Sequence, residues 1–200
     1  MAVKVQSWPR VTKAVYVGVM MFSIAGIVNS VFEPFNDGMN TDSGNMLHYI
    51  LVACMIAGYL LYINGLGRFR TLLDEGDSDA VRKIRNAAIL NIVAYLLALF
   101  SFMTWAGYIL NIIAFFFMMI GFMNLKNSPT FPAGARRGAS SLFLSMILGL
   151  LGNLVILVLG WIPVIGILGD LIGGIILMVS YVMLFSGWAQ IKNANPAVIL

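Results

Sequence analysis

The sequence predicts an all-α, polytopic membrane protein with six transmembrane helices arranged as three tandem helical hairpins. Three observations lead to this prediction: the composition is strongly apolar, long apolar segments recur, and the basic residues follow a regular spacing between them. Of the 200 residues, 60% are hydrophobic and 10% are charged, and the mean hydropathy is +0.94. A soluble domain of this size has too little interior to bury so much apolar surface, so lipid is the expected surrounding.

Apolar segments that are long enough to cross a bilayer core of about 30 Å occur six times. They cover residues 13–32, 46–66, 86–102, 104–124, 138–160 and 170–189, within a single integral membrane domain expected over 1–200. The first segment follows a basic flank, as a signal peptide also does. Because it is long and lacks a small-x-small cleavage pattern, it is expected to be a retained span.

The basic residues fall in segments that the six spans place on one side of the membrane. All twelve follow this rule: Lys4, Arg10, Lys13, Arg68, Arg70, Arg82, Lys83, Arg85, Lys126, Arg136, Arg137 and Lys192. Basic residues are retained in the cytoplasm during insertion, so both termini are expected there, in a bacterial inner or plasma membrane. The net charge of +4 therefore reflects topology, and nucleic acid is not an expected partner. The loop cations Arg82, Lys83 and Arg85 are expected to face anionic headgroups.

The three predicted hairpins, residues 11–70, 82–128 and 136–193, resemble one another. Their second helices end in "GLGRFR", "GFMNLK" and "GWAQIK", with a glycine first and a cation at the sixth place. Their first helices open with a basic residue at 13, 85 and 137. These matches predict a parallel internal repeat about a pseudo-threefold axis along the membrane normal.

Asp170 is the one carboxylate in the longest apolar segment, and two interpretations of it stand. Counted from the shared glycine, it corresponds to His48 and Thr104, which favours an N-cap near the outer interface. Residues 161–169 would then be interfacial or re-entrant. Alternatively the sixth helix begins at Pro163, and Asp170 lies about two turns inside the span. A carboxylate at that depth is a candidate proton or ion site, but the N-cap is the preferred interpretation.

Five further polar residues lie within the spans. Asn29, Ser101 and Asn153 occupy corresponding positions, so they either line a hydrated pathway or bind carbonyls near helix ends, and the second is preferred. Asn91 and Asn111 lie deeper in the third and fourth spans. Asparagine in lipid usually hydrogen-bonds to a neighbouring helix, so a mutual bond within the middle hairpin or a bond between hairpins is expected.

Small and polar residues recur at every fourth position along the fifth span. This seam consists of Ser141, Ser145, Gly149 and Asn153. Small residues at that spacing allow a close approach by another helix, either within the chain or from a partner subunit.

The sequence lacks the motifs of common enzymes. It contains no phosphate loop, CxxC, HExxH or GxSxG motif, and His48 is the single histidine, so no catalytic residue, metal site or cofactor is expected. The leading hypothesis is a non-enzymatic assembly, scaffold or accessory subunit that acts through helix packing in the lipid bilayer, with a membrane-protein partner or a second copy. The alternative is a small-solute or ion transporter or channel, with Asp170 and the Asn29, Ser101 and Asn153 set lining its pathway.

Overall fold

The computed structural model describes residues 2–36, 42–98, 100–160 and 166–197. These residues form six α-helices and one short 3₁₀-helix, and no strand occurs among them. The elements are α1 (Ala2–Asn36), α2 (Asp42–Arg70), α3 (Glu75–Ala98), η1 (Ser101–Met103), α4 (Thr104–Asn127), α5 (Ala133–Gly160) and α6 (Gly166–Asn193).

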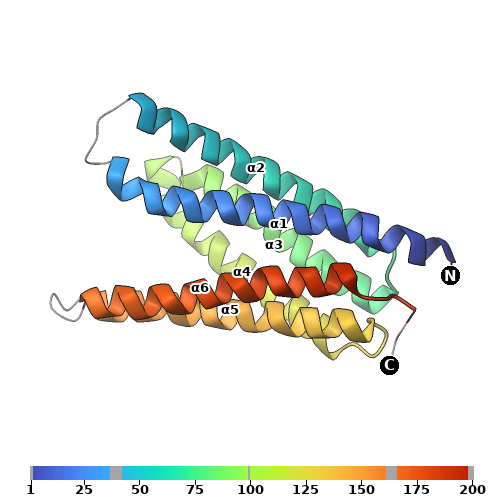
Figure 1. Cartoon of the computed structure of the whole chain (residues 1–200). Helices are drawn as coiled ribbons and strands as arrows, with labels where there is room; N and C mark the ends of the chain where they lie inside the picture. The colour runs from blue at the N-terminus through green and yellow to red at the C-terminus, as the bar shows by residue number, and fades with distance from the viewer. Residues whose placement is uncertain (1, 37–41, 99, 161–165, 198–200) are drawn as a thin grey trace.

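Five of these helices, all except α3, are long and apolar enough to cross a membrane. The chain is therefore a polytopic helical membrane protein, as its composition predicts. In α3, charged residues occupy the first three turns and leave a shorter apolar part. This helix nevertheless runs beside α4 in the bundle (Figure 1). That α3 also crosses the bilayer stays a prediction.

Successive helices pair as three hairpins. The most extensive helix contacts join α1 to α2, α3 to α4 and α5 to α6, while smaller contacts join α2 to α3, α4 to α5 and α1 to α6. The helices alternate in direction, so the start of α1 and the end of α6 lie together (Figure 1). We call this the basic end, because the helix segments that carry all twelve basic residues meet there. The opposite end, where each hairpin reverses, is the turn end. That the hairpins are copies of one another stays a prediction.

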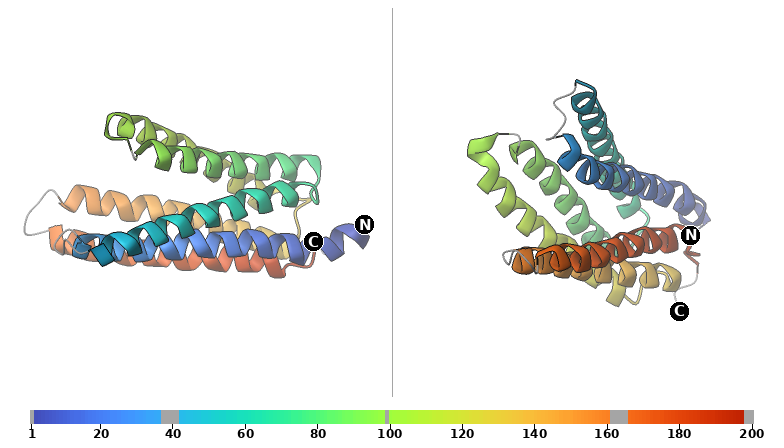
Figure 2. Two further views of the ribbon diagram at one scale, coloured as in Figure 1. Left: turned by 90° about the horizontal axis from the view of Figure 1, so that it is seen from above. Right: turned by 60° about the vertical axis from the view of Figure 1, so that its left-hand side comes forward.

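The buried core lies toward the basic end. The residue after the shared glycine of each hairpin is at most 1% exposed, and so is the residue three positions further on. These six core residues are Leu66, Phe122, Trp188, Phe69, Leu125 and Ile191. Toward the turn end the hairpins spread apart (Figure 2). The bundle is thus closed by packed side chains at one end and open at the other.

The hairpins are held by glycines at which two backbones nearly touch. A Cβ on Gly18 of α1 would lie 2.6 Å from the backbone nitrogen of Tyr62 and 2.8 Å from the carbonyl oxygen of Gly58. Gly138 and Gly187 make the same kind of contact between α5 and α6, where a Cβ on the first would lie 2.5 Å from the carbonyl oxygen of the second. Small residues permit this approach, which increases van der Waals contact between helices in lipid.

The junction of α1 and α6 closes the ring of hairpins. The indole Nε1 of Trp8 donates a hydrogen bond to the carbonyl oxygen of Ile191 at 3.0 Å. The Trp8 ring also packs edge-on against Phe69 of α2, with ring centroids 5.0 Å apart. One buried tryptophan therefore connects the first hairpin to the last.

The interpretation of Asp170 as an N-cap is wrong, because α6 begins four residues earlier, at Gly166. The first turn stays helical because it packs on α5: a Cβ on Gly169 would lie 2.4 Å from the Cβ of Leu159. The alternative start at Pro163 lies outside the described residues, as do 161–165 generally.

The corresponding starts of the other two hairpins also differ from one another. Helix α2 begins at Asp42, six residues before His48. Thr104 is the first residue of α4, with Met103 at the N-cap position. The three helix starts are therefore not equivalent, because the three turns differ in length and composition.

Candidate functional site

A polar cleft of about 480 Å³ lies between α3 and α4 on one side and α5 and α6 on the other. In the described residues α3 does not pack against α5 or α6, which leaves this space between them. Five residues with hydrogen-bonding side chains line it: Asn91, Ser145, Asn153, Ser180 and Tyr181. Gly149 and apolar residues complete the lining, namely Phe115, Met146, Leu150, Leu177 and Leu184.

The α5–α6 wall of the cleft is organised by hydrogen bonds to backbone carbonyls. The Ser180 hydroxyl donates to the carbonyl oxygen of Ser145 at 2.7 Å, which joins the two helices. The Ser145 hydroxyl donates to the Leu142 carbonyl at 2.8 Å, and the Asn153 side-chain nitrogen donates to the Gly149 carbonyl at 2.7 Å. Both serine protons are therefore engaged, and this wall is fixed in place.

The four residues of the predicted seam differ in their surroundings between the centre and the ends. Ser145 is buried, and a Cβ on Gly149 would lie 3.3 Å from the Ser180 hydroxyl, so both face α6. Ser141 instead donates to the carbonyl of Arg137 in its own helix, and Asn153 is exposed. A stripe at every fourth residue advances by about 40° per step around a helix of 3.6 residues per turn, so its ends leave the interface.

The α5–α6 interface follows a seven-residue spacing that the seam misses. On α5 it includes Gly138, Ser145 and Gly152, and on α6 it includes Gly173, Ser180 and Gly187. The seam's contact is thus internal to the third hairpin. Sequence reasoning missed Ser180 and Tyr181, although the position of Ser180 midway between Gly173 and Gly187 marks it as facing α5.

On the opposite wall, Asn91 of α3 faces the cleft, whereas Asn111 of α4 is exposed. The structure gives no hydrogen bond between them over the described residues, so the predicted mutual bond is wrong. Small alanines occupy the buried positions of these two helices, where Ala94 and Ala114 are each 0% exposed. Alanine packing between helices turns the two amides in different directions.

For the remaining predicted site residues, the structure describes the position of the backbone only. Asn29 lies in α1, seven residues before that helix ends, and Asp170 is the fifth residue of α6. Ser101 begins η1, and His48 is in α2. The side chains of these four residues lie outside what the structure describes, so the predicted ring of Asn29, Ser101 and Asn153 stays a prediction.

The cleft carries no charged side chain in its described lining. An ion in such a site would lose its hydration without gaining a counter-charge, which costs several kcal/mol in a membrane interior. Amide, hydroxyl and phenol groups beside apolar walls instead suit an uncharged molecule with a few hydrogen-bonding groups.

A second polar hollow, of about 470 Å³, lies at the basic end beside Asp74, Asp77, Asn124 and Asn127. Here the Thr130 hydroxyl donates to Asp77 at 2.9 Å and ties the α4–α5 loop to α3. No group of three or more His, Cys, Asp or Glu residues suited to a metal ion occurs in the described part of the chain. We interpret this hollow as a loop contact.

Comparisons with protein-family models, curated proteins and solved structures gave no match to this chain. The residues that line the cleft are therefore the basis for the function proposed below.

Proposed function

We propose that the protein is a non-enzymatic transporter that binds a small uncharged solute in the polar cleft and carries it across the membrane. The observation that supports this proposal is the gathering of Asn91, Ser145, Asn153, Ser180 and Tyr181 around one uncharged space between the hairpins. Asn91 belongs to the second hairpin and the other four residues belong to the third, so relative movement of these two hairpins would change the shape of the site.

The closed basic end supports a carrier in preference to an open channel. Trp188 is 1% exposed and packs edge-on against Tyr62 and Phe122, with ring centroids 5.6 Å and 6.1 Å apart. Leu184 of the cleft lies one helical turn from Trp188 on α6, so these rings lie beyond the closed end of the cleft. Passage would require the hairpins to separate there, as repeats rock against one another in other transporters.

The side chains that line the cleft support the non-enzymatic part of this proposal. Acyl or phosphoryl transfer by a serine needs an adjacent base that accepts its proton. Ser145 and Ser180 both donate to backbone carbonyls, and neither histidine nor carboxylate lines the cleft in the described residues. We further propose that the basic end faces the cytoplasm of a bacterial inner or plasma membrane, as its twelve cations favour.

Assembly with another membrane protein is the second candidate. An apolar groove of about 380 Å³ between α1 and α2 favours it, lined by Val17, Met21, Ile24, Leu51 and Cys54 among others. Apolar side chains of a partner helix would fill such a groove. The seam gives no support to this candidate, because Ser145 and Gly149 are already covered by α6.

Thiol labelling tests whether the cleft is wet. In a Cys54→Ser background, we expect Asn153→Cys to react with a membrane-impermeant maleimide added from the turn-end side, because water in the cleft supports thiolate formation. Leu151→Cys is the control: Leu151 is 47% exposed on the same helix, lies further than Asn153 from the turn end and does not line the cleft, so we expect lipid to surround it. Equal resistance of both cysteines to the reagent would contradict a hydrated cleft.

Solute flux tests transport directly. Asn91 and Asn111 are matched, because each lies seven residues from the turn end of its helix, but only Asn91 lines the cleft. With glycerol as the probe in proteoliposome swelling, we expect Asn91→Leu to slow flux about tenfold, the cost of one hydrogen bond to the solute. Asn111→Leu should match the wild type. Equal rates in both variants, or no flux above empty liposomes for a set of neutral polyols and amides, would refute the proposal.

A further inference from the structure

At the basic end, two of the three junctions between hairpins use the same contact. The cation at the sixth place of the shared ending lies over an aromatic ring of the next hairpin. The Nζ of Lys126 is 4.7 Å from the centre of the Phe143 ring, and the Nζ of Lys192 is 4.6 Å from that of Tyr16. Each lysine charge is thereby stabilised by the negative face of a ring.

The third junction, between α2 and α3, differs. Its sixth-place cation is Arg70, and the α3 residue that corresponds to Tyr16 is Ala88, which has no ring. A second cation stands there instead. The Nε and Cζ of Arg85 lie 3.6 Å and 3.9 Å from the position of a Cβ on Gly67 of α2, so this α3 side chain lies against α2. Gly67 and Arg70 are one helical turn apart, which brings both guanidinium groups to one junction.

Each of the two guanidinium groups has one buried donor without an acceptor among the described residues. The Nε atoms of Arg70 and Arg85 are buried and have no hydrogen-bond partner among the described residues. A buried donor without an acceptor destabilises the fold, and two like charges at one contact repel each other. A negatively charged acceptor at this junction would satisfy both Nε donors and reduce the repulsion.

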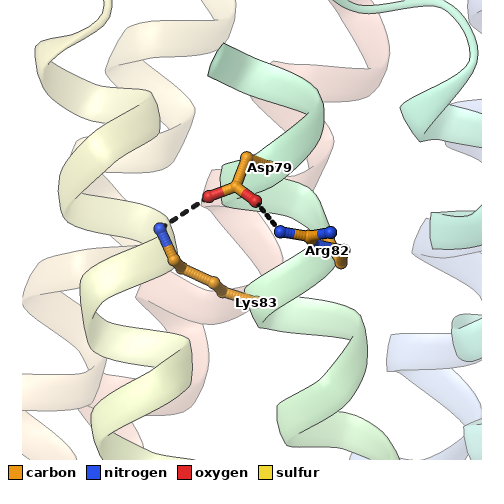
Figure 3. Close-up of polar contacts among 3 residues, drawn as sticks. All are labelled: Asp79, Arg82 and Lys83. Atoms are coloured by element: carbon orange, nitrogen blue, oxygen red, sulfur yellow. Dashed lines mark hydrogen bonds and ion pairs between the residues drawn. The ribbon is translucent and has the colours of Figure 1, made fainter. Parts of the chain in front are cut away.

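Two carboxylates of α3, Asp77 and Asp79, bind other groups. Asp79 binds Arg82 and also binds the Nζ of Lys83 at 2.7 Å (Figure 3). Asp77 accepts the hydrogen bond from Thr130. Neither of them neutralises the arginines at the junction.

We propose that the α2–α3 junction binds a phosphate group between Arg70 and Arg85. The planar guanidinium fork matches phosphate oxygens and forms paired, charge-assisted hydrogen bonds with them. Both side chains are half-buried, so each retains an edge that is open to a ligand. The phosphate belongs either to an anionic phospholipid at the membrane surface or to a soluble phosphate compound. This site is separate from the cleft and does not depend on transport.

Native mass spectrometry of the purified chain in a neutral detergent tests the proposal. The probes are dioleoylphosphatidylglycerol and inorganic phosphate, added separately and in competition. We expect Arg70→Gln and Arg85→Gln each to raise the Kd of the phosphate-containing probe about tenfold, as the loss of a charge-assisted hydrogen bond implies. Arg82→Gln is the matched control: it removes the same charge from the same helix as Arg85, but the Arg82 side chain is 56% exposed and already binds Asp79. Its affinity should stay within about twofold of the wild type.

The outcomes separate the two sources. If phosphatidylglycerol binds and millimolar inorganic phosphate does not displace it, the ligand of the site is a lipid headgroup. If inorganic phosphate displaces the lipid, the ligand is a soluble phosphate compound. Equal weakening by Arg82→Gln and Arg85→Gln would mean that net charge alone attracts the lipid, and would overturn the proposal. Absence of binding in both arms would also overturn it. If the glutamine variants do not fold, Arg70→Lys and Arg85→Lys keep the charge but lose the fork, and unchanged affinity in both would refute the site.

Discussion

Gly18→Ala is the sharpest test of the close helix contacts. The new Cβ would meet three backbone atoms of α2: the nitrogen of Tyr62 at 2.6 Å, the carbonyl oxygen of Gly58 at 2.8 Å and the Cα of Tyr62 at 2.9 Å. Backbone atoms of a helix cannot rotate away as a side chain does. The two helices must therefore move apart.

The required movement gives the magnitude. Ordinary contact begins at 3.4 Å, so the shortest distance of 2.6 Å must grow by the difference, about 0.8 Å. A gap of that size forfeits about a quarter to a half of the dispersion energy at the contact, and overpacking of this kind costs about 1–3 kcal/mol. Alanine favours the helix by about 1 kcal/mol relative to glycine. Subtracting this gain leaves an expected net loss of up to about 2 kcal/mol in the free energy of unfolding, and an expected difference of about 1–3 kcal/mol from a glycine-to-alanine change that meets no backbone.

Unfolding in mixed detergent–SDS micelles measures this difference, and Gly174→Ala is the matched control. Gly174 also lies within a helix, but a Cβ there would meet no atom within 4 Å. This control should be as stable as the wild type or up to about 1 kcal/mol more stable. If Gly18→Ala and Gly174→Ala have the same free energy of unfolding, the backbone contact between α1 and α2 does not limit how closely these helices approach, and the prediction is refuted.

Three further predictions concern single polar contacts. The hydrogen bond from Lys83 lowers the pKa of Asp79 from its ordinary value of 3.8, so the stabilisation should be fully present above pH 3.8 and lost as the pH falls through the lowered pKa of the folded state. Melting temperatures of wild type and Asp79→Asn should differ at pH 7, and the difference should shrink only as the pH falls below 3.8. Ser180→Ala removes the bond to the Ser145 carbonyl and should cost about 0.6 kcal/mol in SDS unfolding, whereas a cost above about 2 kcal/mol would exceed what one such bond supplies. Trp8→Phe keeps a ring but loses the bond to Ile191, and it should lower the unfolding free energy by about 1 kcal/mol at the least.

The membrane class and the pairing of helices are predictable from sequence, because span length and charge placement act locally. The endings "GLGRFR", "GFMNLK" and "GWAQIK" also mark positions with similar packing. A Cβ added to Gly65, Gly121 or Gly187 would lie less than 3 Å from an atom of the preceding helix. A glycine followed by a large apolar residue marks both the close approach and the start of the buried core.

The cleft is not predictable in the same way. It depends on how α3 sits relative to α6, and neither helix has an apolar face that distinguishes one side from another. Asn91 and Asn111 show the difficulty, because the same residue type at the same depth faces the cleft in one helix and the outside in the other. The start of α6 was mispredicted for a related reason. Packing of Gly169 on Leu159 extends the helix past the residue that looks like its cap.

The bond from Trp8 to Ile191 spans 183 positions of the chain. Until α6 has been synthesised and inserted, the Trp8 indole has no Ile191 carbonyl to bind, and this side of the first hairpin lacks its contact with the third. Contacts of such long sequence separation form late. The packing of α1 is therefore completed only when α6 docks against it.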